Sequence, residues 1–173
     1  VKPALRTPPT CFRTQKISPE AAPDVERDGG KWRAGLIRQA AIVTRGEARG
    51  YGFWIDTDFL AAIERAINAD ERGVKTRFTH PSLSDDGLGK FLGRATNATN
   101  DGQTVKADIH FSQTAHKTPD GDLAGYIMDL AEQHPESFGA SIVFTRDLEA
   151  EEQFSEQHDQ SPDEENTNNL PHV

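Results

Sequence analysis

The chain is poor in sulfur, in aromatic residues and in long apolar runs. Its 173 residues include one cysteine, one methionine, two tryptophans and two tyrosines, and the mean hydropathy is -0.68. The lone Cys11 excludes a disulfide within the chain and a thiolate metal cluster, and it favours a reducing compartment. No apolar run approaches the roughly 18 residues that span a bilayer, and the first 30 residues lack the apolar core of a signal peptide. We therefore expect a soluble cytoplasmic protein without a membrane partner.

Basic charge is missing from one end of the chain. The net charge is -9, and residues 147–173 hold nine acidic residues but no Lys or Arg. The remaining chain is balanced in charge and has no basic stripe. A protein that binds nucleic acid through its phosphates needs such a stripe to release counterions. We therefore expect no nucleic-acid partner.

Composition divides the chain into three parts. Residues 1–31 carry five prolines among scattered charges, which predicts a disordered leader. Residues 32–146 contain the periodic apolar segments and are expected to form one folded domain, while residues 147–173 are expected to be a disordered acidic tail. The chain opens on Val1 and closes on a short apolar segment, so we expect a fragment whose continuation supplies a last strand and a further catalytic residue.

The first half of the domain predicts a hairpin followed by a helix. Residues 36–43 and 51–55 have strand character on either side of a turn rich in charge and glycine. Thr57 is a plausible N-cap, and apolar residues recur after it at helical spacing until Gly73.

The second half predicts a hairpin, a helix and a last strand. Residues 90–96 and 103–111 flank Asn100-Asp101-Gly102, a strong hairpin signal, and a helix beginning near Leu123 stops before Pro135. Strands with two interposed helices on one small core predict an α+β fold, a mainly antiparallel barrel or curved sheet with helices packed outside.

Two strand-like segments each carry one reactive side chain. Residues 74–80 end on His80, which alternation places with Val74, Thr76 and Phe78, so a partly desolvated imidazole would be held as a neutral base. Residues 137–144 carry Ser141, and the small residues beside it leave space for a substrate backbone. This pairing suggests a serine nucleophile and its base. The competing interpretation is structural, since such a serine often bonds to backbone.

Other reactive constellations are weak. His110 and His116 lie near Asp108 and Asp120, but no metal-binding spacing is present, so no metal is expected. The glycine-rich residues 87–93 lack phosphate-loop spacing, so no cofactor is expected.

An ordered series of segments carries a family resemblance over about residues 35–146. In chain order these are Arg-Phe-Thr-His, Leu-Gly-Lys-Phe-Leu-Gly-Arg, Val-Lys-Ala-Asp-Ile-His-Phe, a helix, and Ser-Phe-Gly-Ala-Ser-Ile-Val. The series resembles the prohead (capsid maturation) proteases of tailed phages, which are serine peptidases related in fold to the herpesvirus assemblins. The resemblance implies that Ser141 is the nucleophile and His80 the general base.

The resemblance also implies partners and a place of action. Substrates would be the phage scaffolding protein or a segment of the major capsid protein, cut inside the assembling procapsid in the host cytoplasm, with self-cleavage as a further activity. Homo-oligomerisation stays open. The third residue, which orients the histidine in the family, is unassigned, although Asp147, Glu149 and His158 follow the serine. The alternative is a non-catalytic capsid assembly or scaffolding module.

Overall fold

The computed structural model of the chain describes residues 10–13, 24–27, 34–48, 51–78, 90–145, 147–158 and 164–172. The strands are β1 (Thr10–Arg13), β2 (Asp24–Glu26), β3 (Leu36–Thr44), β4 (Gly46–Ala48), β5 (Phe53–Ile55), β6 (Val74–Phe78), β7 (Lys90–Asn100), β8 (Thr104–Phe111) and β9 (Ser141–Phe144). The helices are α1 (Thr57–Asn68), α2 (Leu123–Gln133) and α3 (Leu148–His158), with 3₁₀ turns η2 (Gln113–His116) and η3 (Pro135–Ser137).

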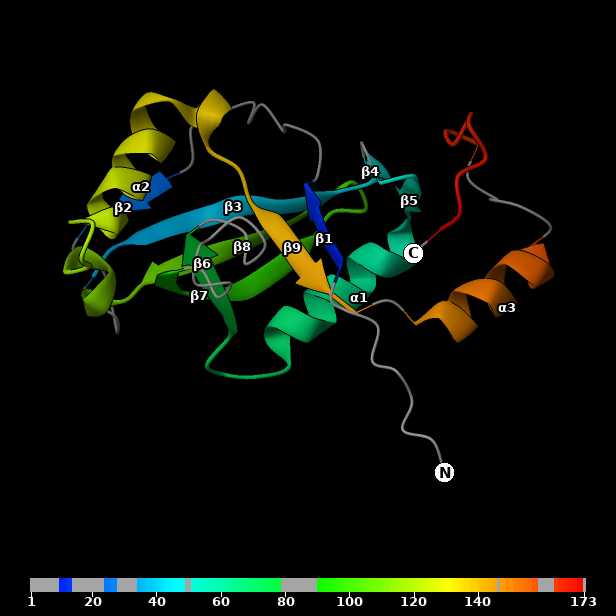
Figure 1. The fold of residues 1–173 in the computed structure, drawn as a ribbon, viewed down its shortest axis with the longest axis horizontal. Helices are drawn as coiled ribbons and strands as arrows, with labels where there is room; N and C mark the ends of the chain where they lie inside the picture. Colours follow the sequence, from blue (N-terminus) through cyan, green and yellow to red (C-terminus); the bar gives the residue numbers. More distant parts are fainter. Residues whose placement is uncertain are drawn as a thin grey trace.

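An antiparallel five-stranded sheet in the order β2-β3-β8-β7-β6 organises the domain, and Figure 1 shows the helices around it. Its edge strands β2 and β6 do not pair with each other, so the sheet is open within the described residues. The predicted α+β class is therefore confirmed, with an open sheet in place of a closed barrel. Two further pairs, β4–β5 and β1–β9, form small separate sheets.

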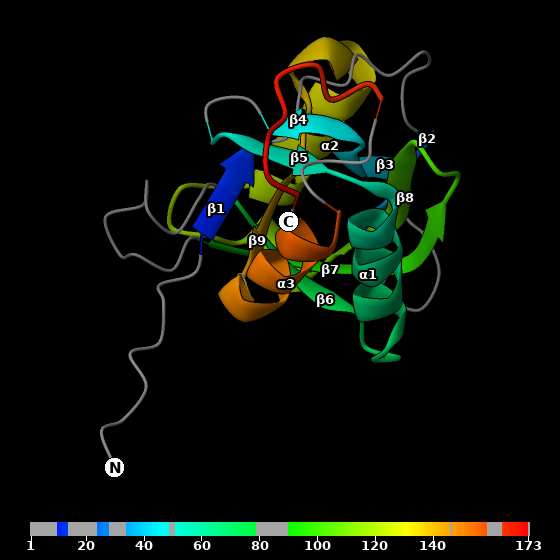
Figure 2. The same cartoon turned by 90° about the vertical axis from the view of Figure 1, so that its right-hand side faces the viewer.

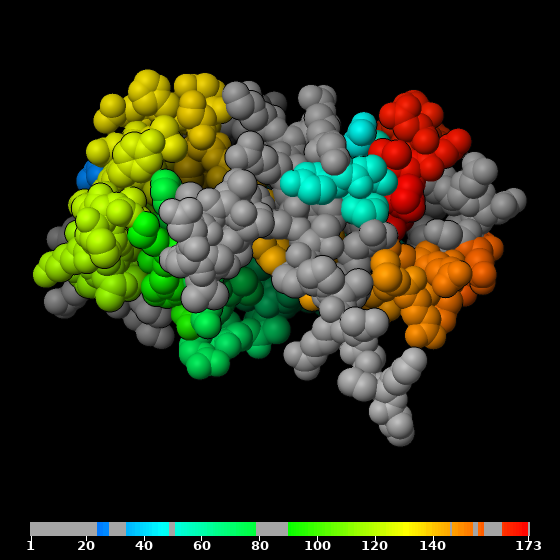
Figure 3. All heavy atoms as spheres, viewed as in Figure 1, coloured from blue at the N-terminus to red at the C-terminus, as the bar shows by residue number. Residues whose placement is uncertain are grey.

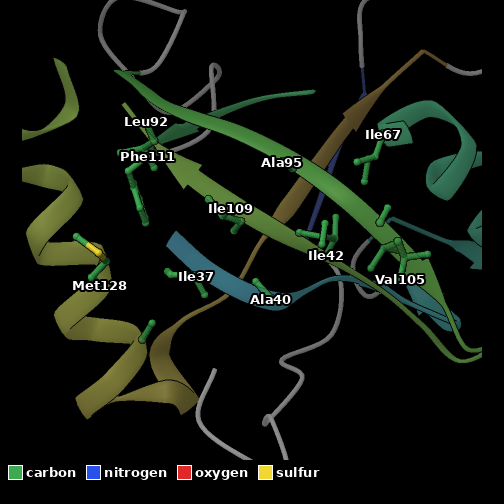
Figure 4. Packing of buried hydrophobic residues seen from close by; sticks show 14 of the residues in the cluster. Ile37, Ala40, Ile42, Ile67, Leu92, Ala95, Val105, Ile109, Phe111 and Met128 are labelled. Atoms are coloured by element: carbon green, nitrogen blue, oxygen red, sulfur yellow. The ribbon is translucent and has the colours of Figure 1, made fainter. Parts of the chain in front are cut away.

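The core lies between the sheet and the side chains of β9, α1 and α2 that pack against it. The largest fully buried side chains are Phe111, Ile37, Leu60, Met128, Val43 and Val105. Figure 4 shows apolar side chains of this core coming from β3, β7, β8, α1 and α2, with Met128 at the end of the sheet near Phe111 and Ile37. Alternation along β8 sends Val105, Ala107, Ile109 and Phe111 to this face, as the sequence predicts.

The predicted first hairpin does not form, because its two strands pair with other strands. Strand β5 pairs with the three-residue β4, whereas β3 pairs with β2 and β8. The chain turns sharply after β3, and Arg45 N donates to Gln103 O at 2.8 Å, which fixes the end of β3 to the β7–β8 hairpin. A long strand in the sheet centre gains more from two neighbours than from a short local partner.

Helix α1 forms where predicted, with a different cap. The carboxylate of Asp56 accepts a hydrogen bond from Phe59 N at 2.8 Å, so Asp56, not Thr57, is the N-cap. The helix ends at Asn68, whose side-chain amide donates to Ala98 O and accepts from Ala98 N, both at 2.9 Å. These bonds hold α1 against β7 and satisfy backbone groups at an irregularity in that strand.

The two ends of the chain contain more structure than expected. Strands β1 and β2 lie within the predicted leader and pair with β9 and β3. In the predicted tail, residues 148–158 form α3, and residues 164–172 include the buried Asn166 and His172. Figure 3 shows this C-terminal segment, in red, against β5 in cyan. Within the described residues, backbone pairing holds β1, β2 and the segment beside Trp54, and a polar contact joins His172 to Asp56.

Candidate functional site

Ser141 is the first residue of β9 and lies on the outer side of that strand. Alternation sends Ile142 and Phe144 inward, where both pack against the core, while Ser141 and Val143 are exposed. The Phe144 ring meets the Phe59 ring of α1 edge-on, with centroids 4.9 Å apart. Strand β9 is therefore half-buried, and Ser141 lies on its exposed face. Its hydroxyl belongs to the outer face of a strand whose inner face is anchored.

The chain before Ser141 leaves room on one side. A β carbon placed on Gly139 would meet no described atom within 4 Å, whereas Ala140 packs against the core. The space expected beside the serine thus comes from Gly139 alone. A backbone approaching the outer face of β9 from this side would meet no side chain of residue 139.

A strand from the start of the chain lies alongside the serine strand. β1 pairs with β9 in antiparallel register, which sets Arg13 opposite Ser141 and Cys11 opposite Val143. Figures 1 and 2 show this ribbon crossing one face of the five-stranded sheet, with α1 beside it. Ser141 is therefore next to an extended backbone segment in the folded chain.

His80 lies outside the described residues. The strand that leads to it, β6, is an edge strand that pairs with β7 and ends at Phe78, two residues before the histidine. The Phe78 ring meets Tyr126 of α2 at a centroid distance of 6.5 Å. The Phe78–Tyr126 contact places the end of β6 beside α2, and β9 follows α2 in the chain. In Figure 1 the end of β6 and the start of β9 therefore both lie toward the α2 side of the molecule.

The three candidates for the orienting residue belong to α3 and its cap. Asp147 accepts a hydrogen bond from Ala150 N at 3.1 Å, so it caps this helix. Glu149 is exposed in the first turn, where its charge favours the positive end of the helix dipole, and His158 is the last helical residue. Each therefore has a position that helix formation explains.

A buried histidine-carboxylate pair joins the C-terminal segment to α1. His172 Nδ1 lies 2.6 Å from Asp56 Oδ2, and the side chains are 4% and 13% exposed. Beside it, Trp54 N donates to Pro171 O at 2.9 Å. Asp56 thus uses one oxygen to cap α1 and the other to hold His172. No local pattern predicts a contact between residues 116 positions apart.

A second histidine pair ties the start of β3 to α2. His116 Nε2 lies 2.7 Å from Ala34 O, and its Nδ1 lies 2.8 Å from Asp122 Oδ1. Burial disfavours the charged ring, but the Ala34 carbonyl and the Asp122 carboxylate outweigh it, so the pKa of His116 is raised. The pKa of Asp122 is lowered, mainly because its carboxylate accepts a hydrogen bond from Gly125 N. This pair caps and anchors α2.

A polar cluster lies within the sheet itself. Asp108 is 7% exposed and accepts hydrogen bonds from Gln39 N at 2.9 Å and Asn97 Nδ2 at 3.0 Å. Gln39 and Asn97 have φ of 48° and 51° at irregularities in β3 and β7. Burial favours neutral Asp108, yet these hydrogen bonds outweigh it and lower its pKa. The cluster satisfies backbone groups that the bulges release from the ladders.

His110 follows this cluster on β8. Burial lowers its pKa, against the opposing influence of the nearby Asp108 carboxylate. Across the described ranges, no group of three or more His, Cys, Asp or Glu side chains is arranged to hold a metal ion. Among the same residues, no helix is both long and apolar enough to cross a membrane.

Strand β9 carries an exposed serine beside an extended strand, and a serine hydroxyl can act as a nucleophile. The two histidine pairs cap helices and anchor chain segments, and Asp108 accepts hydrogen bonds from groups at the irregularities of the sheet. Ser141 is the one predicted site residue whose surroundings are described, and the extended strand β1 lies beside it. Comparison with protein-family models, with curated proteins and with solved structures found no match to this chain.

Proposed function

We propose that the protein is a serine endopeptidase of the phage prohead protease type. The observation that carries the proposal is Ser141 itself, exposed on the outer side of an anchored strand and next to an extended segment. A serine on a rigid strand keeps its hydroxyl in a fixed position, which nucleophilic attack requires. The substrate class, scaffolding or capsid-protein segments cut during procapsid maturation, rests on the sequence resemblance.

In the proposed reaction, His80 takes the proton of Ser141 as Oγ attacks the carbonyl carbon of the scissile peptide bond. Backbone N–H donors stabilise the oxyanion of the tetrahedral intermediate. The C–N bond then breaks as His80 returns the proton to the departing amine. A water molecule, deprotonated by His80, hydrolyses the acyl-enzyme and regenerates Ser141.

The first test requires no knowledge of the natural substrate. A fluorophosphonate probe phosphonylates an activated serine and releases fluoride, so it reports the nucleophile directly. The wild-type protein should be labelled, and Ser141→Ala should abolish the labelling. Ser137→Ala is the matched control, because Ser137 is also exposed and its hydroxyl donates to Glu136 in η3. Equal labelling of the wild type and Ser141→Ala would overturn the assignment.

The base is tested in the same assay. His80→Ala should lower the labelling rate by roughly two to four orders of magnitude, the usual contribution of a general base. Circular dichroism would show whether the variant remains folded. A folded variant labelled at the wild-type rate would remove His80 from the mechanism.

The second candidate is a non-catalytic module that binds scaffold or capsid subunits. The β1–β9 ribbon favours it, because this part of the fold is made by adding one strand to another, a common mode of protein association. Under this alternative the wild-type protein would co-sediment with capsid subunits but would resist labelling by the probe.

A further inference from the structure

The edge of β9 that faces β1 is a backbone-binding surface. Within the described residues, β9 belongs to a two-stranded sheet with β1 alone. It is anchored independently of that partner, because Ile142 and Phe144 pack against the core and Phe144 contacts Phe59. The described ladder of β1, by contrast, is the one with β9. Strand β9 is thus fixed to the domain by its own side chains, in addition to the ladder.

The register brings this surface to the proposed nucleophile. Thr10 is paired with Phe144 at one end of the ladder, and Arg13 is paired with Ser141 at the other. Directly paired residues in an antiparallel ladder have Cα atoms about 4.5–5.5 Å apart. A peptide bond attacked by a serine must come within about 3–3.5 Å of the hydroxyl oxygen. An extended substrate lying along this edge of β9 would therefore need the space that β1 occupies.

The β1–β9 ladder is short, so another strand could compete with β1 for the edge of β9. A ladder of four residues in a two-stranded sheet is marginally stable on its own. Most of the chain lies between β1 and β9, so their pairing closes a long loop and carries the corresponding entropy cost. A segment that pairs more strongly with β9 could replace β1, because the side chains of β9 would keep that strand in place.

We propose that the edge of β9 binds an extended peptide by strand addition, with β1 as its resident occupant. β1 must leave before another segment reaches Ser141. The catalytic consequence rests on the proposed serine peptidase function, whereas the strand exchange itself does not. The partner is an extended peptide segment of the protein to be cut. The N-terminal strand thereby regulates access to the site.

The first experiment fixes the register in solution. Cys11, the sole cysteine, is paired with Val143, and directly paired positions meet the Cα spacing of a disulfide. In the full chain, Val143→Cys should form an intramolecular disulfide under mild oxidation, detected by mass spectrometry of the non-reduced digest. Leu148→Cys, at a similarly exposed position in α3, is the matched control and should not. A disulfide that forms no faster in V143C than in L148C, or only between two molecules, overturns the proposal.

The second experiment measures access to the edge. The probe is a fluorescein-labelled peptide of residues 8–15 with serine in place of cysteine. The full-length double variant C11P/F12P removes two consecutive backbone donors from β1. One of the two faces β9 in the antiparallel ladder, and the loss of that hydrogen bond weakens pairing by about 0.5–1.5 kcal/mol. The variant should bind the peptide about tenfold more tightly than the wild type. The matched control C11V/F12V keeps both donors and should bind like the wild type. Oxidised V143C should lose binding, and dithiothreitol should restore it.

The readouts separate this inference from the proposed function. Peptide binding and cross-linking need no catalysis, so they remain measurable if the fluorophosphonate probe labels nothing. Failure of labelling with tenfold tighter peptide binding by C11P/F12P would sink the peptidase and keep the strand-exchange site. Peptide binding that C11P/F12P does not strengthen, with Ser141-dependent labelling intact, would sink the strand-exchange site and keep the peptidase.

Discussion

The β7–β8 hairpin and the β1–β9 ribbon are both antiparallel pairs, yet they are built in opposite ways. Three residues join β7 to β8, and the Asp101 carboxylate accepts hydrogen bonds from Gln103 N and Thr104 N in that turn. The ribbon joins strands from opposite ends of the chain, and two inward side chains of β9 hold it to the core. Local pairing depends on turn chemistry and burial, whereas distant pairing depends on the rest of the fold already being in place.

The difference has a functional meaning. The hairpin carries the centre of the core and must not open, because the central side chains of the cluster come from it. The ribbon carries the proposed nucleophile on a strand that, under the strand-exchange proposal, changes partners while its inward side chains stay on the core. Regions that bind and release other molecules are commonly drawn from the less stable parts of a protein.

The largest expected effect is the difference in stability lost when a side chain is truncated in the hairpin and in the ribbon. Phe111→Ala removes a fully buried ring from β8 and should lower the free energy of unfolding by about 3–5 kcal/mol. Ile142→Ala in β9 should cost clearly less, because this side chain is only partly buried. Urea unfolding followed by circular dichroism gives both values. Equal losses would show that the ribbon is part of the cooperative core.

The second prediction tests how the C-terminal segment is held. His172→Ala removes the partner of a nearly buried carboxylate oxygen and should cost about 1–3 kcal/mol of stability. In a Trp32→Phe background the fluorescence reports Trp54, which pairs with this segment, so detachment should shift its emission to the red. His134→Ala, at an exposed position, is the control. Unchanged emission and stability in His172→Ala would make the contact dispensable.

The third prediction tests the turn that joins β7 to β8. Asp101→Ala removes a carboxylate that accepts two backbone hydrogen bonds, and should lower stability by about 1 kcal/mol. The same hydrogen bonds, first that from Thr104, lower the pKa of Asp101, so its contribution is present at neutral pH and fades as pH falls through the lowered value. Glu71→Ala, at an exposed position in another turn, is the matched control. Melting temperatures from about pH 2.5 to 7 measure both.

The smallest expected effect concerns the pair that anchors α2. The raised pKa of His116 means that the folded state binds its proton more tightly than the unfolded chain, whose value is near 6.5. Its stabilising contribution is therefore complete below about pH 6.5 and disappears as pH rises through the folded value. His116→Gln should lower the melting temperature more at about pH 5.5 than at about pH 8.5. A loss that is larger at the higher pH would contradict the assignment.

Some elements follow from residues close together in the chain. The turn residues Asn100 to Gly102 and the alternation of β8 predict the central hairpin, and apolar spacing with Pro135 predicts α2 and its end. The sequence also predicts the strand before His80, although His80 itself lies outside the described residues. Ser141 is on a strand as expected, but it faces outward.

What the sequence by itself determined is the local part: the α+β class, the β7–β8 hairpin, helices α1 and α2, and the serine as a candidate nucleophile. Only the tertiary structure decided that β1 pairs with β9, that β5 turns back on β4, and that His172 reaches Asp56. The physical reason is that turns, caps and periodicity act over a few residues, so their signals lie in short stretches of sequence. Pairings between distant residues form because an unpaired strand or a buried carboxylate must find a partner, and which partner is near depends on how the whole chain packs.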